Sequence, residues 1–286
     1  MANSKVWLVT GASKGLGLAL VQELLTQGYA VAATSRNKQE LIDAVNTTDH
    51  HFLPLQVDLN NEGSIQKAID ETINLFGQLD VVVNNAGYGL AGSLEELSDT
   101  EARKNFDVNV FGTLNIIRRV MPYLRAQQSG HIFNISSIGG FTGNFPGFGI
   151  YCATKFAVEG LTESLSAEIR SFGIHATIVS PGYFRTQFLS QGSFAVPSNP
   201  IEAYKVVREV QAAHQHQING NQMGDPVKAA KALIEVATSK NPPLHLFLGS
   251  DAFQLAVDKI NAVQTEMETW KAVTVSTAFT EQPAEA

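Results

Sequence analysis

The feature that most constrains the fold is a regular alternation between short apolar runs and longer stretches with helical periodicity. The apolar runs are rich in Val, Ile and Leu, and they cover residues 6–10, 29–34, 52–58, 79–85, 131–136, 175–180 and 244–249. Runs that are apolar on both faces are typical of parallel strands covered by helices on both sides. The helical stretches cover 15–27, 37–46, 62–76, 98–127, 151–171, 225–239 and about 251–271. We therefore predict an α/β fold with a doubly wound, mostly parallel seven-stranded sheet and helices on both faces.

The alternation continues without a linker or an internal repeat, which predicts one domain over residues 1–272. With 286 residues, of which 44% are hydrophobic, the chain can bury one large core. A Pro-Gly pair breaks the pattern after the sixth run. We interpret 183–223 as an insertion, in which 187–223 forms a substrate loop that closes over the substrate as a lid. Residues 273–286 are expected to be a loosely held C-terminal tail.

The composition argues against several classes of function. A formal net charge of −7 at pH 7 disfavours a general binder of nucleic acid or of anionic membranes. No apolar run reaches the length of about 18 residues that a membrane span needs, so we predict no membrane association. The N-terminus enters a strand pattern at once, which leaves no room for a signal peptide, and a lone cysteine fits a reducing compartment. We expect a cytoplasmic protein.

The histidines and the cysteine do not indicate a metal site. His214 and His216 are two residues apart in a helical stretch, which is poor spacing for one helix face, and no carboxylate cluster accompanies them. Cys152 is interpreted as a small packed residue rather than as a redox switch. We predict that the protein holds no metal.

A glycine-rich loop follows the first predicted strand directly. The stretch "TGASKGLGLAL" places Gly11, Gly15 and Gly17 at the start of a helix. Glycines at such a position let backbone N–H groups approach a pyrophosphate at the helix N-terminus. The spacing differs from the GxGxxG fingerprint, and an ordinary strand-to-helix turn is the alternative. The position at the first βα turn of an alternating sheet favours dinucleotide binding.

Two basic residues indicate which dinucleotide is bound. Arg36 lies nineteen residues after Gly17 at the end of the second predicted strand, where no acidic residue is present. An acidic residue there suits the ribose of NAD, whereas an arginine suits the 2′-phosphate of NADP. Lys14 adds a second cation within the glycine loop. The alternative is that both are solvated surface cations; we predict NADP(H) as the cofactor.

Tyr151 and Lys155 form the most suggestive pair in the chain. They are four residues apart in a predicted helix, so both side chains lie on the same face. A cation near a phenol favours the phenolate and lowers the pKa of the tyrosine. The pair is therefore either a tuned acid/base or an ordinary helix surface, and the spacing alone does not decide between them.

Taken together, the motifs resemble those of the short-chain dehydrogenase/reductase family over about residues 5–250. The motifs that carry the resemblance are "TGASKGLG" (10–17), "VDL" (57–59), "NNAG" (84–87), "NVFG" (109–112), "ISS" (135–137), "YCATK" (151–155) and "PGYFRT" (181–186). The resemblance implies a Rossmann-type fold and a nicotinamide cofactor. It also implies that the protein is an enzyme with a Ser–Tyr–Lys–Asn catalytic site.

The resemblance implies a role for each catalytic residue. Tyr151 would be the proton donor to a ketone or the base for an alcohol, and Lys155 would hold the nicotinamide ribose and lower the pKa of the phenol. Ser137 would bind the substrate oxygen, and Asn109 would support a water chain to Lys155. Hydride transfer to a carbonyl builds negative charge on oxygen, which positioned donors stabilise.

The serine assignment has an alternative. Ser137 lies fourteen residues before Tyr151, one more than the commonest spacing in the family, and Ser136 is the other candidate. We interpret the extra residue as part of the glycine-rich loop 139–149, which can absorb it.

The resemblance also implies a set of further cofactor contacts. Asp58 would accept a hydrogen bond from the adenine amine, and Thr186 would lie near the carboxamide. The other matched positions lie in loops that follow predicted strands: Ser13, Leu16, Leu59, Asn85, Ala86, Gly87, Pro181 and Gly182.

The predicted substrate is a hydrophobic ketone or secondary alcohol. The variable segments around the expected site are rich in aromatic residues, which suits an apolar ligand, although several of them could be core: Phe141, Phe145, Phe148, Tyr183, Phe184, Phe188 and Phe194. A non-catalytic regulator that binds NADP(H) is the alternative function, and an epimerase or dehydratase is a rival within enzymes. By resemblance, we expect a homodimer or homotetramer that pairs through the helices near 98–127 and 151–171.

Overall fold

One central sheet organises the molecule. The computed structural model describes residues 5–190 and 192–279. The sheet has seven strands in the order β3-β2-β1-β4-β6-β7-β9, and every neighbouring pair is parallel. The predicted strands are therefore confirmed, with bounds that differ by one or two residues. They are β1 Val6–Val9, β2 Ala30–Ser35, β3 Phe52–Gln56, β4 Val81–Asn84, β6 Gly130–Ile135, β7 Ile174–Pro181 and β9 His245–Leu248.

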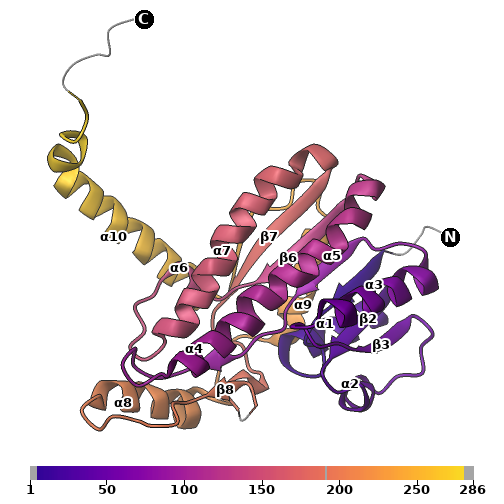
Figure 1. Cartoon of the computed structure of the whole chain (residues 1–286), viewed down its shortest axis with the longest axis horizontal. Helices are drawn as coiled ribbons and strands as arrows, with labels where there is room; N and C mark the ends of the chain where they lie inside the picture. Colours follow the sequence, from indigo (N-terminus) through magenta and orange to yellow (C-terminus); the bar gives the residue numbers. More distant parts are fainter. Residues whose placement is uncertain (1–4, 191, 280–286) are drawn as a thin grey trace, which may run out of the picture.

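Helices cover both faces of this sheet (Figure 1). The face that packs on Trp7 and Val9 carries α1 Gly15–Thr26, α2 Lys38–Val45 and α9 Pro226–Thr238. The face that packs on Leu8 carries α3 Glu62–Phe76, α5 Gly112–Gln127 and α7 Gly149–Ile169. Successive side chains of a strand point to opposite faces, and Trp7, Leu8 and Val9 are all buried, as a sheet covered on both sides requires.

Local capping explains where several helices begin. Asn37 and Asn61 accept hydrogen bonds from the first-turn amides of α2 and α3. Ser98 and Glu101 form a reciprocal capping box at the start of α4 Asp99–Phe106. Asp225 caps α9, in which Pro226 occupies the first helical position. Side-chain oxygens at these positions satisfy backbone N–H groups that have no partner within the helix.

The helix predicted over 98–127 is interrupted. Between α4 and α5 the chain forms one π-helical turn, η1 Asp107–Phe111, which contains Asn109. A π turn inserts one extra residue into the helical ladder and re-aims the side chains on it, and such turns are frequent at functional sites. Periodicity could not reveal this interruption, because the apolar pattern continues through it.

The segment predicted to be a substrate loop has structure of its own. It contains η3 Gln187–Leu189, β8 Phe194–Ala195, α8 Lys205–Ala213 and the π turn η4 His214–Ile218. β8 pairs with the short strand β5 Gly89–Leu90, which attaches the segment to the main body. The remaining short helices are α6 Ile138–Phe141, in the region predicted to be a loop, and η2 Arg170–Phe172.

The last helix, α10 Ser250–Val275, is longer than predicted and runs away from the body of the molecule (Figure 1). The predicted tail therefore begins as helix, and residues 280–286 of it lie outside the described residues. Within the described part of the chain, none of the helices combines the length and apolar character needed to span a membrane.

Candidate active site

The predicted site residues gather at the carboxyl edge of the parallel sheet. The glycine loop follows β1, the "NNAG" stretch follows β4, Ser137 follows β6, and the "PGYFRT" stretch begins at the end of β7. The strand order reverses between β1 and β4, which makes their carboxyl ends a topological switch point. Ligands of open α/β sheets bind at such a point.

The glycine loop packs directly against the turn after β4. Gly11 has a φ of +63°, and a Cβ on it would lie 2.7 Å from the Cα of Ala86. A Cβ on Gly17 would lie 2.5 Å from Nδ2 of Asn85. Glycine is therefore required at both positions, at Gly11 also because side chains rarely adopt that φ.

A threonine that the sequence analysis did not single out joins the same two loops. Oγ1 of Thr10 accepts hydrogen bonds from the backbone N–H groups of Asn85 and Ala86, at 3.0 and 3.1 Å. Thr10 is 1% exposed at the end of an apolar strand. A buried hydroxyl in such a place is the signal that could have indicated this role.

The residues present fit a dinucleotide. The first turn of α1 has no side-chain hydrogen bond from its N-cap residue, Lys14, and contains no acidic residue. Its backbone N–H groups and the positive end of the helix dipole are therefore suited to a pyrophosphate. Gly15 also has a φ of +63°, and Thr186 lies beside it, with its Cβ 3.7 Å from where a Cβ on Gly15 would be. Ser13 in the same loop and Leu16 in the first turn of α1 are half-buried.

The residues expected on the adenosine side lie on neighbouring strand ends. Arg36 and Asp58 are exposed just beyond β2 and β3, whose last residues, Ser35 and Gln56, pair with each other. The carboxylate of Asp58 accepts a hydrogen bond from the N–H of Asn60 at 3.0 Å. Leu59, also predicted to lie near the adenine, is half-buried next to it.

Tyr151 and Lys155 lie on one buried face of α7. They are 8% and 5% exposed, and Nζ of Lys155 is 5.8 Å from the centre of the Tyr151 ring. Nζ donates a hydrogen bond to the carbonyl of Ile135 at 2.8 Å. A Cβ on Gly87 would lie 3.6 Å from that Nζ and 3.0 Å from Oδ1 of Asn109. The pair is therefore not an ordinary helix surface, and the turn after β4 reaches it.

The structure places Ser137, not Ser136, beside the phenol. A hydrogen bond with Ser137 lowers the pKa of Tyr151, opposing the effect of burial. The hydroxyl of Ser137 also accepts a hydrogen bond from the N–H of Gly139 at 3.1 Å. Ser136 is buried, and its hydroxyl donates to the carboxylate of Glu159 at 2.8 Å. Ser136 is therefore committed to a buried network away from Tyr151.

The pKa values of the pair are governed by burial. Burial raises the pKa of Tyr151 well above its ordinary value of 10. It lowers the pKa of Lys155 from 10.5 to about 8, although the carboxylate of Glu159 acts in the opposite direction. The expectation that the pKa of the phenol is lowered is therefore not met by these side chains alone, because a buried phenolate would lose its hydration.

Asn109 is held rigidly by the π turn. Its side chain exchanges hydrogen bonds with the backbone of Tyr88, both at 3.0 Å, and donates to Oγ1 of Thr154 at 3.1 Å. Asn105, which the sequence analysis did not identify, donates to the same carbonyl of Tyr88 at 3.0 Å. The two asparagines fix the turn that follows β4 against α7.

Known proteins share both this sequence pattern and this architecture. The sequence model of the short chain dehydrogenase family matches residues 5–193. The chain belongs to this family. It is similar to the 3-ketodihydrosphingosine reductase of Bacteroides thetaiotaomicron, with 36% identity over 86% of this chain and 88% of that protein. The chain is an oxidoreductase of the short-chain dehydrogenase type with a Rossmann-type fold.

Solved structures agree. A short-chain dehydrogenase from Streptomyces avermitilis has a TM-score of 0.88 and 34% identity, over 98% of this chain and 100% of that one. The structure of ElxO with NADP bound has a TM-score of 0.72 and 26% identity, over 88% of this chain and 99% of that one. Structures of the same fold with lower identity hold NADH or NAD. The last three of these neighbours thus bind nicotinamide cofactors, with the 2′-phosphate (NADP) in one structure and without it (NAD or NADH) in the others.

The "PGYFRT" stretch of this short-chain dehydrogenase is held by α10. Pro181 is the last residue of β7, and a Cβ on Gly182 would collide with the carboxylate of Asp251 in the first turn of α10. That carboxylate accepts a hydrogen bond from the N–H of Tyr183 at 2.7 Å. Asp251 therefore positions the loop after β7, a contact that depends on residues far apart in the sequence.

Aromatic residues enclose Tyr151 on the substrate side. The ring of Tyr151 lies 6.0 Å from that of Phe188 and 6.4 Å from that of Phe148, centre to centre. Phe194 and Leu189 belong to the same buried cluster. Of the aromatic residues predicted to line the pocket, Phe141 packs instead beside α10, and Phe184 packs against the core that contains α9.

One polar pair, Tyr183 and His214, lies among these aromatic residues. Nδ1 of His214 lies 2.7 Å from the carbonyl of Val210, and Nε2 lies 2.9 Å from the hydroxyl of Tyr183. A carbonyl only accepts, so Nδ1 carries a proton and donates to Val210, and Nε2 is the ring atom that meets the Tyr183 hydroxyl. The ring of His214 is buried 4.8 Å from that of Phe148. The sequence analysis gave His214 no role, because its side-chain partner, Tyr183, comes from a distant segment.

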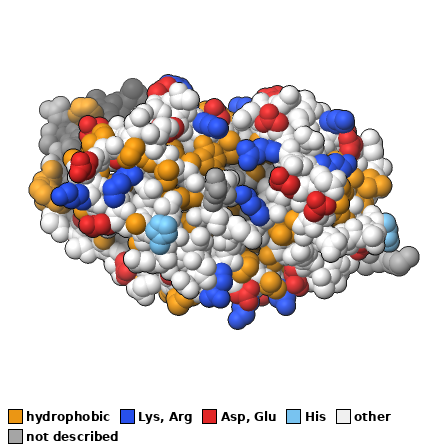
Figure 2. Space-filling model, turned by 90° about the horizontal axis from the view of Figure 1, so that it is seen from below, with side chains coloured by type: hydrophobic (Ala, Val, Ile, Leu, Met, Phe, Trp, Pro, Cys, Tyr) orange, Lys and Arg blue, Asp and Glu red, His pale blue; other side chains and the backbone are white. Residues whose placement is uncertain are grey.

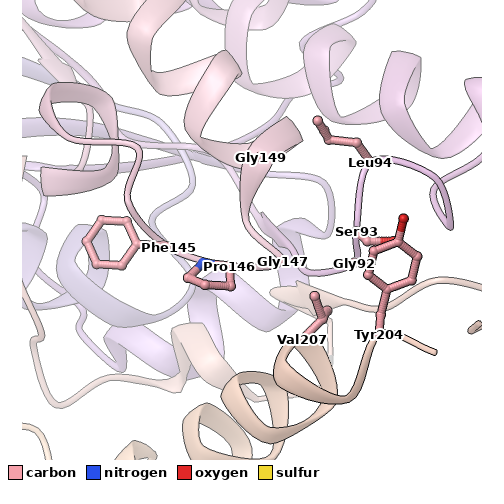
Figure 3. A pocket seen from close by; sticks show the side chains of 9 residues that line it. All are labelled: Gly92, Ser93, Leu94, Phe145, Pro146, Gly147, Gly149, Tyr204 and Val207. Carbon is pink, nitrogen blue, oxygen red and sulfur yellow. The ribbon is translucent and has the colours of Figure 1, made fainter. Parts of the chain in front are cut away.

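A cavity of about 360 Å³ lies beside the start of α7 (Figure 3). The turn that includes Phe145 lines one side, the loop after β5 a second, and α8 closes it from below. Its lining residues are Gly92, Ser93, Leu94, Phe145, Pro146, Gly147, Gly149, Tyr204 and Val207. Tyr151 does not line it, but Phe145 also packs on the aromatic cluster around Tyr151.

A group of potential metal ligands lies elsewhere. Asp49, His50 and His51 have ligand atoms within 4.8 Å of one another, and they precede β3. They therefore lie at the amino edge of the sheet, opposite the site, and the group is at the surface without a further feature that indicates an ion.

Proposed function

We propose that this protein is an NADP(H)-dependent oxidoreductase that interconverts a hydrophobic secondary alcohol and a ketone, with Tyr151 as proton donor and acceptor. The observation that carries the proposal is the buried Tyr151 hydroxyl, which lies beside Ser137 and on the same helix face as Lys155. The three side chains share the edge of the sheet with the glycine loop. Few other arrangements need a phenol, a hydroxyl and an ammonium group together at a dinucleotide site.

Each side chain has a distinct task in this mechanism. The nicotinamide, when bound, supplies a hydride to the carbonyl carbon or accepts one from the alcohol. Ser137 Oγ donates a hydrogen bond to the carbonyl oxygen and orients it. Tyr151 Oη gives its proton to that oxygen as negative charge develops there, and takes it back in the reverse direction. The ammonium of Lys155 stabilises the phenolate that remains and binds the ribose hydroxyls.

Burial supports this division of tasks. Because burial raises the pKa of Tyr151, the proton stays on the phenol until a developing alkoxide accepts it. The ammonium of Lys155 favours the phenolate, and the oxidised nicotinamide would add a second positive charge when it is bound. Asn109 maintains the position of the turn after β4, which separates the glycine loop from Lys155.

Two basic residues favour NADP(H) over NAD(H). Lys14 and Arg36 follow β1 and β2, on the side where a Rossmann-type fold holds the adenosine ribose. Lys and Arg side chains also gather near the middle of the face that carries the strand ends (Figure 2). The similarity to ElxO, which was solved with NADP, supports this choice.

Cofactor preference tests this part of the proposal. We expect kcat/KM with NADPH to exceed that with NADH by at least about tenfold, because two cations stabilise a dianionic phosphate. Arg36→Asp should reverse or remove that preference and lower kcat/KM with NADPH alone. An exposed basic residue elsewhere, Lys67→Ala, is the matched control. A clear preference of the unaltered protein for NADH would refute the choice of NADP(H).

The aromatic residues around Tyr151 favour an apolar substrate. Phe148, Phe188 and Phe194 lie around Tyr151 in one buried cluster of hydrophobic side chains, and His214, hydrogen-bonded to Tyr183, lies against Phe148. The similarity to a 3-ketodihydrosphingosine reductase supports a ketone with a long apolar part. The hydroxyl of Tyr183, hydrogen-bonded to His214, is a polar group beside this cluster that could bind a polar group on the substrate.

A regulator that binds NADP(H) without turnover is the second candidate. Tyr151→Phe separates the two functions, because it removes the transferable proton and keeps the ring. We expect turnover of a panel of ketones, followed by NADPH absorbance, to fall by at least about a hundredfold, the usual contribution of a positioned acid. Binding of NADPH, measured by fluorescence titration, should change little. Retained turnover would exclude the acid/base role, and absence of turnover in the unaltered protein across the panel would favour the regulator.

We also propose a cytoplasmic homodimer or homotetramer that binds neither nucleic acid nor membranes. The negative net charge supports this. Phe111 and Phe156 are 51% and 45% exposed on η1 and α7, the elements through which assembly was expected. Exposed aromatic side chains on adjacent helices support a protein–protein contact there.

A further inference from the structure

Among residues 5–190 and 192–279, α10 packs against the rest of the protein through its first two turns. Ala252 and Ala256 are buried in a small cluster with Ile138. Every residue from Asp258 through Val275 is exposed. Figure 1 shows this outer part of the helix running away from the sheet and from the helices that cover it.

The outer part of α10 carries a continuous apolar stripe. Ile260, Val263, Met267 and Trp270 follow one another at spacings of three and four residues, so they lie on one face of the helix. They are 52%, 36%, 66% and 62% exposed. Apolar surface that is exposed in a continuous stripe is characteristic of interaction sites.

This part of the helix has little to stabilise it alone. It is rich in β-branched residues, which have low helix propensity: Ile260, Val263, Thr265, Thr269, Val273, Thr274 and Val275. The ion pair between Glu268 and Lys271, at 3.3 Å, is exposed and contributes little. Isolated helices of about this length are marginal in water, and helices in proteins are stabilised mainly by packing of their apolar face. The stripe therefore needs a covering surface.

The charges beside the stripe indicate what covers it. Lys259 and Glu266 are two turns apart on the same flank and have opposite signs. When two copies of α10 cross antiparallel, Lys259 of each copy faces Glu266 of the other, so the surface is complementary to itself. An anionic membrane is disfavoured, because Asp258, Glu266 and Glu268 outnumber Lys259 and Lys271, whereas helices that bind such membranes are basic.

We propose that α10 is a dimerisation arm through which two copies of this chain associate. The outer halves of the two helices cross antiparallel, with Ile260 and Val263 of each copy at the centre of the contact. Lys259–Glu266 ion pairs form on both sides of it. Trp270 of each copy then reaches the N-terminal end of the other α10, where Phe253 is 63% exposed. The arm is remote from Tyr151, so this proposal stands independently of the reaction.

Removal of the apolar contact tests the arm. The mass of the full chain is measured by sedimentation over a range of concentrations for the unaltered protein, Ile260→Asp and Met267→Asp. We expect each substitution to halve the mass and to raise the Kd at least a hundredfold, with NADPH binding unchanged. Thr269→Asp, on the opposite face of the helix, is the matched control and should keep the mass. Any contact between copies elsewhere persists in all variants. An unaltered protein with the same mass as Ile260→Asp would overturn the proposal.

A charge exchange tests the antiparallel geometry. Lys259→Glu and Glu266→Lys should each raise the Kd by about tenfold, because each places like charges together twice in the dimer. The double variant restores opposite charges and should restore the Kd. Glu268→Lys, outside the flank, is the control. Single variants that behave like the unaltered protein would overturn the antiparallel crossing.

Hydrogen exchange separates association from loss of folding. In the unaltered protein we expect amides of 258–275 to be protected at high concentration. In Ile260→Asp these amides should exchange freely, while those of α1 remain protected and show that the body is folded. Equal exchange of 258–275 in both proteins would contradict the proposal. Sedimentation of a monomeric unaltered protein with vesicles of phosphatidylcholine and phosphatidylserine would also overturn it, in favour of a membrane.

Discussion

Lys155 carries an ammonium group into the protein interior, where it has one hydrogen bond to a backbone carbonyl. Burial lowers its pKa to about 8, so the folded protein holds this charge less well than the unfolded chain does. Below pH 8 the buried charge therefore destabilises the fold. Between pH 8 and 10.5 the unfolded chain binds the additional proton, so stability rises with pH in that window as the penalty disappears.

Replacement of the ammonium by an apolar group should therefore raise the stability of the protein and lower its activity. We expect Lys155→Met to raise the free energy of unfolding at pH 7 by on the order of 1–3 kcal/mol, since each pKa unit corresponds to about 1.4 kcal/mol. The gain should vanish by about pH 10.5, and turnover should fall by at least about a hundredfold. Urea denaturation at several pH values measures the first effect. The exposed Lys67→Met is the control, and a stability gain that is independent of pH would contradict this account.

The two neighbouring serines should respond in opposite ways. Ser137→Ala removes the hydroxyl beside Tyr151 and should lower kcat/KM by about a hundredfold, the cost of one positioned donor, with little change in stability. Ser136→Ala leaves the buried Glu159 with the hydroxyl of Ser180 as a partner, at 2.9 Å. It should lower the free energy of unfolding by about 1–3 kcal/mol and affect turnover less. The reverse pattern of effects would make Ser136 the residue that binds substrate.

At the scale of elements, one buried ion pair attaches the substrate loop to the body. Oε2 of Glu96 lies 2.6 Å from Nη2 of Arg208 in α8, and its carboxylate also accepts hydrogen bonds from the N–H groups of Ser93 and Ile201. Burial raises the pKa of Glu96, but these partners together hold it below its ordinary value. Ser93, which donates to this carboxylate, lines the cavity together with Tyr204 and Val207.

Loss of this ion pair should loosen the loop. Arg208→Met keeps the apolar stem and removes the charge, which leaves the carboxylate of Glu96 short of a partner. We expect the KM for an apolar ketone to rise about five- to twentyfold while kcat and the affinity for NADPH change little, because the hydrogen-bond partners of Arg208, Glu96 and Gln211, lie outside the cofactor loops. Steady-state kinetics with Lys205→Met, an exposed residue on the same helix, provide the control. An equal loss of cofactor affinity would show that the segment does not act on substrate alone.

For the whole molecule, the sheet could be predicted because both faces of the central strands, such as β1 and β4, are buried. Runs such as "VWLVT" and "LDVVVNN" leave no polar face, and that pattern permits a parallel sheet with helices on both sides. The glycine loop and the Tyr151–Lys155 pair could be placed because both depend on local spacing. The contacts of Gly11 and Gly17 with Ala86 and Asn85, which also require glycine there, come from a distant segment and were not visible in that spacing.

Other features could not be predicted, because they depend on partners far apart in the chain. The bond between Tyr183 and His214 joins the end of β7 to a π turn. The contact of Gly182 with Asp251 joins β7 to α10. The choice between Ser136 and Ser137 depends on Glu159, in the middle of α7. Periodicity predicts which face of an element is buried, but not which polar groups meet there.

The strand order has a consequence for how the chain is made. β1 emerges first from the ribosome, β2 and β3 extend the sheet on one side, and β4, β6, β7 and β9 then extend it on the other. Each new strand therefore pairs with the outermost strand of the sheet formed so far, and none has to insert between two strands that are already paired. The nascent polypeptide can build the sheet in the order in which its strands are translated. The sheet is complete only when β9 has left the exit tunnel.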